Sequence, residues 1–408
     1  MFSFLSKGSA QRRTLVFASA THVWSDLFYA LLIPLLPLMQ ADSDLGLSYS
    51  QVGLLRSVYS GASAALQIPA GIMAETLGEF WLLIGGNIWV AAGLVGMALV
   101  PSYLFLLAIT LVSGLGGGTQ HPLATSMVSR AYDKRGRSTA IGIVNFSGDL
   151  GKMAAPVLAL LIALRQGWRT TLRVAGFGGI AFMTASMFVR RGVNSGRPSA
   201  TVDDTERDGP QRVNKRGFFA LSGVGFLDSG TRSAALTFLP FIMKDKGLSD
   251  EQIFTLLIFL LAGGAAGKFI CGWLDDRYGS IRLIWGTKGL TAALLLAAMA
   301  TPPLAMAPLM VVLGIGLNGT SSVLYSTVSA FAPTSRRARI YGYYYTVTES
   351  GGTLAPVIYG RVADLFKLRT AMIAMSLVTS LILPASLALR KPLADQELPA
   401  EDPSPQAE

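Results

Sequence analysis

The residues of this sequence that can do chemistry are charged side chains inside long apolar segments. A charge at the centre of a bilayer costs at least about 2.5–3.5 kcal/mol, so each one is a candidate functional residue. Four are acidic and four are basic: Asp26, Asp149, Asp228, Glu349, Arg56, Lys152, Arg232 and Lys268. This balance leaves the charge of a bound substrate open.

The residues best suited to proton exchange are a histidine and an aspartate one helical turn apart. His22 and Asp26 are separated by four residues, so they share one face of a helix. Histidine titrates near neutral pH, and we predict that this pair takes part in proton coupling, with helix packing as the alternative. Asp149 and Glu349 recur at matching places in the two halves of the chain and are further candidates for proton coupling.

Two other pairs suggest substrate binding. Asp228 and Arg232 are four residues apart, and Asp149 and Lys152 are three apart, so either pair can be a structural ion pair. An arginine in such a place can also clamp a carboxylate of a substrate, and we favour this role for Arg232. We therefore predict that Arg232, Asp228 and Lys152 bind the substrate, whereas Glu349 would suit a cation or a proton.

Further polar residues are weaker candidates for lining a substrate site. Gln120, Asn145 and Tyr325 have helix packing or an interhelical hydrogen bond as their alternative role. They are Arg56, Gln120, His121, Asn145 and Tyr325.

The elements that must position these residues are membrane-spanning helices. Only 14% of the 408 residues are charged, 51% are apolar, and the mean hydropathy is +0.48. A soluble domain has about 25% charged residues, so the composition argues against one. Apolar segments of about the 20 residues that a bilayer requires predict twelve spans, near 14–39, 50–74, 80–101, 103–131, 136–164, 170–190, 217–243, 250–274, 281–301, 304–331, 337–363 and 369–390.

Polar segments divide the chain. We predict an amino-terminal six-helix bundle (1–190), a solvated linker (191–216), a carboxyl-terminal six-helix bundle (217–390) and a disordered tail (391–408). With both termini in the cytoplasm, the inner segments hold 21 of the 34 Lys and Arg residues and the outer loops hold 8. This asymmetry predicts a multi-pass protein of the inner membrane with cytoplasmic termini, and the net charge of +10 requires no nucleic acid.

The two predicted bundles are related by an internal repeat of about 200 residues. Leu47-Ser48 with Gln51 recurs as Leu248-Ser249 with Gln252, and Ala155-Pro156 recurs as Ala355-Pro356. Two parallel repeats with a substrate site between them are typical of one large class of secondary transporters.

A loop sequence carries a resemblance to the major facilitator superfamily. Gly272-Trp-Leu-Asp-Asp276-Arg277-Tyr-Gly279 resembles the signature between the second and third helices of each half, where the family has a gating charge network. The first copy is reduced, with Gly71 retained and Glu75 in place of the aspartate. The resemblance implies that helices three, six, nine and twelve are outer scaffold. Lys288 on the ninth span is then an exception, and we expect it to reach the inner membrane face.

The amino half is most similar to the fosmidomycin-resistance group of exporters. The similarity rests on four stretches: His22 and Asp26 before a Leu-Pro-Leu run, Gln67-Ile-Pro69-Ala-Gly71, Gly116 and Gly118 before His121-Pro122, and Gly148 and Gly151 before Pro156. Leu123 stands where the group favours an acidic residue, and Asp149 and Lys152 lie on a helix that is usually uncharged there. The substrates of the group therefore do not transfer to this chain.

Other classes of function find little support. The sequence shows no phosphate-binding loop, no metal-ligand cluster and no catalytic triad, so we expect no enzyme, no cofactor and no metal. We predict a monomeric transporter that works by alternating access and exports a small organic compound or drug in exchange for protons. The alternative is proton-coupled uptake of a small organic anion such as a carboxylate.

Overall fold

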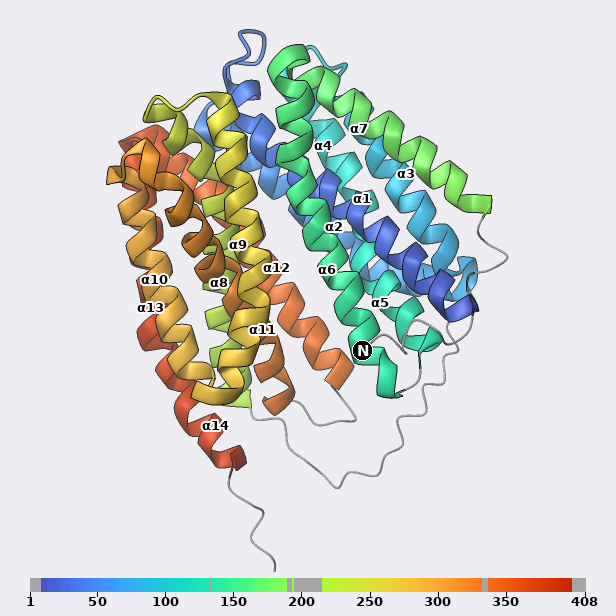
Figure 1. The fold of residues 1–408 in the computed structure, drawn as a ribbon, viewed down its shortest axis with the longest axis vertical. Helices are drawn as coiled ribbons and strands as arrows, with labels where there is room; N and C mark the ends of the chain where they lie inside the picture. Colours follow the sequence, from blue (N-terminus) through green and yellow to red (C-terminus); the bar gives the residue numbers. More distant parts are fainter. Residues whose placement is uncertain (1–8, 133, 189–192, 194–214, 332–336, 398–408) are drawn as a thin grey trace, which may run out of the picture.

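The computed structural model describes residues 9–132, 134–188, 193, 215–331 and 337–397, whose regular secondary structure is helical without any strand (Figure 1). The amino half contains α1 (Ser9–Gln40), α2 (Tyr49–Leu77), α3 (Glu79–Met97), α4 (Tyr103–Gly117), α5 (Gln120–Ala131), α6 (Lys134–Leu158), η2 (Ala159–Ala163) and α7 (Leu164–Ser186). The carboxyl half contains α8 (Lys215–Asp245), α9 (Asp250–Tyr278), α10 (Ser280–Ala300), η4 (Pro303–Ala305), α11 (Met306–Phe331), α12 (Arg337–Phe366), α13 (Leu368–Ser386), η6 (Leu387–Leu389) and α14 (Arg390–Glu397).

Twelve long helical rods are present in the described ranges, which confirms the predicted all-α fold. The fourth rod consists of α4 and α5, and the fifth of α6, η2 and the start of α7. The chain reverses at Gly167, whose φ of 79° is accessible to glycine at little cost, and the rest of α7 is the sixth rod. The predicted disordered tail starts at residue 391, whereas the structure has the short helix α14 up to Glu397.

Among the described residues, eight helical stretches are long and apolar enough to cross a membrane, and one of them, 139–186, contains two rods. The rods outside this set are α2, α8 and α12. They carry Arg56, Asp228 with Arg232, and Glu349, respectively, which lowers their apolar character. Other candidate charges, such as Asp26 on α1 and Asp149 on α6, lie on helices that meet the limit.

The internal repeat is visible in local structure. Ser48 caps α2 through the amide of Gln51, and Ser249 caps α9 through the amide of Gln252, each in a reciprocal capping box. The turn after each of these helices is a glycine, Gly78 or Gly279, with φ of 81° and 79°. The same sequence signals thus begin and end the second rod of both halves.

The two halves form separate bundles that meet mainly through α2 with α12 and through α6 with α9 (Figure 1). We call the end that carries residues 41–48 the loop end, and the opposite end, where α8 begins, the linker end. At the loop end a Cβ on Gly53 would lie 2.1 Å from the carbonyl oxygen of Pro356, so only glycine permits this contact. Asp364 of α12 also accepts the amides of Tyr49 and Ser50 at 2.8 and 2.9 Å. The halves are therefore tightly packed at the loop end.

Candidate functional site

Asp26 is the centre of a polar cluster formed by α1, α5 and α6. Its side chain is only 4% exposed, and Oδ2 lies 3.1 Å from Lys152 Nζ and 3.6 Å from His22 Nε2. His121 Nε2 lies 3.9 Å from the other carboxylate oxygen, with its side chain 54% exposed. The structure thus brings the predicted pair together and adds His121 and Lys152 from other helices. The cluster thus brings one carboxylate, two imidazoles and an ammonium group into mutual contact.

The same cluster places three potential metal ligands together. The ligand atoms of His22, Asp26 and His121 lie within 4.8 Å of one another, which the sequence spacing did not reveal. Lys152 already supplies a positive charge to the carboxylate. A second cation at this carboxylate is therefore disfavoured.

Asp149 connects the two halves. Lys268 Nζ of α9 donates to both carboxylate oxygens of Asp149 at 2.7 Å, and Lys152 Nζ lies 3.3 Å away on the other side. Phe146 and Phe269 pack beside this contact with ring centroids 5.6 Å apart. Because Lys152 also contacts Asp26, charges alternate in sign from Asp26 in α1 to Lys268 in the opposite bundle.

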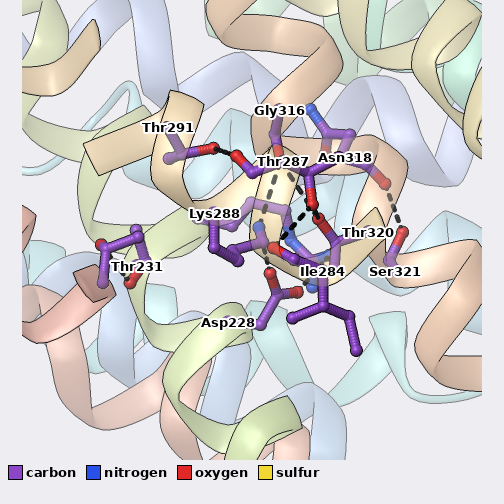
Figure 2. Close-up of polar contacts among 12 residues, drawn as sticks. Asp228, Thr231, Ile284, Thr287, Lys288, Thr291, Gly316, Asn318, Thr320 and Ser321 are labelled. Carbon is purple, nitrogen blue, oxygen red and sulfur yellow. Dashed lines mark hydrogen bonds and ion pairs between the residues drawn. The ribbon is translucent and has the colours of Figure 1, made fainter. Parts of the chain in front are cut away.

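Asp228 of α8 has Lys288 of α10 as its ion-pair partner (Figure 2). Lys288 is fully buried and also donates to the carbonyl oxygen of Gly316 in α11 at 3.1 Å. The expectation that Lys288 reaches the membrane face is therefore wrong. The lysine stem can extend towards a buried carboxylate as readily as towards water, and Asp228 provides that partner.

Arg232 makes a looser contact with Asp228 than their four-residue spacing predicts. Its NH1 lies 3.9 Å from Asp228 Oδ2, beyond hydrogen-bond distance, and NH2 donates to Ser229 Oγ at 3.3 Å. Its side chain is 22% exposed, and it lines a small cavity together with Asp228, Ser229, Ser321, Tyr325 and Thr348. Glu349 of α12 is half-buried and within electrostatic reach of the guanidinium.

Several weaker candidates have packing contacts instead. Arg56 is buried, donates to the carbonyl oxygen of Tyr29 at 2.9 Å and stacks over the ring of Tyr29 at 4.7 Å. Gln120 is buried and bonded to Asn87 and Thr21 at 3.0 and 3.3 Å. These are packing contacts, and the part of Arg56 and Gln120 in substrate binding stays a prediction.

The remaining two polar candidates differ in exposure and surroundings. Asn145 is exposed on α6. Tyr325 lines the Arg232 cavity and stacks on Tyr345 with centroids 4.8 Å apart. Of these two residues, Tyr325 is the one that shares a cavity with Arg232.

The loop motif lies at the linker end between α9 and α10. Arg277 stacks over Trp273 at 4.0 Å, and the Asp276 side chain lies outside the described residues. Gly71 and Glu75, the reduced first copy, lie on α2, and Glu75 is exposed. The amino half instead has an ion pair between fully buried Glu79 of α3 and Arg130 of α5, which sequence spacing could not indicate.

Comparisons with known proteins agree on the kind of protein. The chain is 24% identical over 352 residues to the fosmidomycin resistance protein of Escherichia coli, covering 85% of each. It is 26% identical to a probable 4-methylmuconolactone transporter of Cupriavidus pinatubonensis, covering 93% of this chain and 90% of the relative. It is 25% identical to a probable sulfoacetate transporter of Cupriavidus necator, covering 86% and 88%.

Solved structures share the fold. A bacterial homologue of the human lysosomal transporter Spinster, in an inward-facing and occupied conformation, superposes with a TM-score of 0.84 at 17% identity, covering 96% of this chain and 99% of that one. A nucleoside transporter superposes with a TM-score of 0.74 at 13% identity, covering 92% and 99%. The model of the Major Facilitator Superfamily matches residues 19–356 and 221–407. Together with the twelve rods and the repeated halves, this match shows that the chain belongs to the Major Facilitator Superfamily.

Proposed function

We propose that this protein is a proton-coupled transporter that takes up a small organic anion by alternating access. The observation that carries the proposal is the chain of alternating charges from Asp26 to Lys268, which joins the proton-accepting cluster to the contact between the halves. In this fold the substrate site lies between the halves, near the middle of the membrane.

Arg232 is the proposed anchor for the anion. Within the described part of the chain, Asp228, Lys288 and Arg232 carry one net positive charge between them. The guanidinium faces a cavity with the hydroxyl groups of Ser321 and Tyr325. A planar guanidinium with neighbouring hydroxyls suits a carboxylate or sulfonate.

The direction of coupling follows from charge. Asp26 and Asp149 balance Lys152 and Lys268 when both carboxylates are ionised. Protonation of Asp26 leaves Lys152 in excess and adds one positive charge next to the substrate site. A bound proton therefore favours a bound anion, and by linkage a bound anion favours the proton. Such positive coupling is the basis of symport, which drives uptake.

Export is the second candidate function. The relatives that favour it are the fosmidomycin resistance protein and a multi-drug resistance efflux pump of Streptococcus pneumoniae, which is 23% identical. Relatives named as transporters of sulfoacetate and gentisate, which are organic anions, favour the first candidate. Proton-driven export would require the proton and the substrate to compete, the opposite of the charge relation above.

The substrate class is tested by thermal unfolding of the purified protein with sulfoacetate, gentisate, fosmidomycin and uncharged analogues of matched size. A ligand that binds the native state raises the melting temperature. We expect stabilisation by at least one anion and by no uncharged analogue. Stabilisation by neutral or cationic compounds alone would contradict an anion site.

We further propose that the protein acts as a monomer in the inner membrane with both termini in the cytoplasm. In a Cys271→Ala background, a cysteine at Ser199 in the linker should resist a membrane-impermeant maleimide in intact cells and react after lysis. A cysteine at Ser43, in the connection between α1 and α2, is the matched control and should react in intact cells. The reverse pattern would place the linker outside.

A further inference from the structure

We propose that Lys288 is a positioning residue that keeps Arg232 available for the anion by holding the charge of Asp228. The inference rests on the proposed function of Arg232 as an anchor. Lys288 lies on α10, which the family resemblance makes an outer scaffold helix. Lys288 is not one of the residues that line the Arg232 cavity.

The first step of the argument is competition for Asp228. This carboxylate is 3% exposed, and two cations of the described chain lie within 4 Å of it, Lys288 and Arg232. Lys288 makes the close contact, while NH1 of Arg232 remains 3.9 Å away. The carboxylate is thus neutralised from α10 and not from its own helix (Figure 2).

The second step is the difference in surroundings between the two cations. Lys288 has no exposed side-chain surface and is fixed by the carbonyl oxygen of Gly316, which also accepts from Thr320 at 3.3 Å. Arg232 is 22% exposed and has one hydrogen bond of 3.3 Å, to Ser229. The ammonium group is therefore committed to Asp228, whereas the guanidinium can turn towards a ligand.

The third step is what happens without Lys288. Arg232 lies on the same face of α8 as Asp228, and arginine and carboxylate form strong two-point pairs. A buried carboxylate that has lost one cation would draw in the remaining one. Arg232 would then be occupied within the protein, and an incoming anion would have to displace Asp228.

The test follows the reactivity of Arg232 directly. Phenylglyoxal modifies accessible guanidinium groups, and mass spectrometry of peptides gives its rate at each arginine. Exposed Arg361 normalises the reaction, and buried Arg56 reports loosening of the fold. Lys288→Met should slow modification of Arg232 about tenfold, and Lys288→Arg should leave it close to the wild-type rate. The double variant Asp228→Asn with Lys288→Met should restore the rate, because the carboxylate that draws in Arg232 when Lys288 is lost is then absent.

Each outcome decides the inference. An unchanged rate in Lys288→Met, or no recovery in the double variant, would overturn it. If Lys288→Met fails to fold, shown by rapid modification of Arg56, Lys288→Gln replaces it, because glutamine also removes the ammonium charge but can donate a hydrogen bond to Asp228, and it should slow modification of Arg232 in the same way. The reagent requires no bound anion, so failure of the anion panel would refute the proposed function without touching this result.

Discussion

Replacing Asp26 by asparagine is expected to abolish proton-driven accumulation of the anion while the protein still folds and still binds the anion. Asparagine is neutral, as protonated aspartate is, so it leaves Lys152 without its partner in α1 and permanently mimics the proton-bound state. Wild-type affinity for the anion should rise as the pH falls from about 8 to about 6. The carboxylate of the anion in solution keeps its charge over this interval, so the change in affinity reports groups of the protein. The affinity of Asp26→Asn should depend less on pH over this interval, and the dependence that remains comes from His22 and His121.

The matched control is Asp44→Asn, the same change at an exposed residue near the loop end, which should keep both accumulation and the pH dependence. Binding is measured by titration calorimetry, and accumulation in vesicles with an imposed proton gradient. Accumulation by Asp26→Asn at the wild-type level would assign Asp26 to packing. Proton coupling would then move to Glu349 or Asp149.

Replacing Arg232 by glutamine is expected to weaken binding of the anion by about 10- to 100-fold, because hydrogen bonds to a charged group contribute about 1.5–3 kcal/mol. Asp228→Asn should leave anion binding in place, since Arg232 remains. The double variant with both changes should fold and bind as poorly as Arg232→Gln.

Arg361→Gln, at an exposed position of α12, is the control and should bind as the wild type does. Full recovery of binding and transport in the double variant would mean that Arg232 and Asp228 form only a structural ion pair. The measured quantity is the dissociation constant, with the melting temperature confirming that each variant is folded.

Sequence patterns predicted the parts of this structure that depend on neighbours along the chain. The capping boxes at Ser48 and Ser249 and the turn at Gly279 are set by short-range chemistry, so they could be found from spacing. The contact of His22 with Asp26 likewise follows from one helical turn.

Contacts between helices could not be predicted in this way. Spacing gives the depth of Lys288 or Lys268, but the rotation of each helix about its axis decides which partner its side chain meets. The sequence therefore predicts that Lys288 reaches the membrane face, whereas in the structure Lys288 contacts Asp228. Arg56 was placed at a plausible depth, yet its helix turns it towards Tyr29.

The link between the halves illustrates the same limit. The pairing of Asp149 with Lys152 could be inferred from three residues of separation, whereas Lys268 comes from the other bundle. Only the packing of α6 against α9 brings that second lysine to the carboxylate. The alternating charges on which the proposed coupling depends are thus a property of the assembled fold.

The most direct test of proton-coupled uptake is the movement of protons with the anion. Purified protein is reconstituted into vesicles that contain the pH-sensitive dye pyranine, at equal internal and external pH, and sulfoacetate or gentisate is added outside. Symport predicts acidification of the interior in wild-type vesicles, with no pH change in vesicles carrying Asp26→Asn. Alkalinisation of the interior as the anion enters would instead show exchange against protons and would contradict the account.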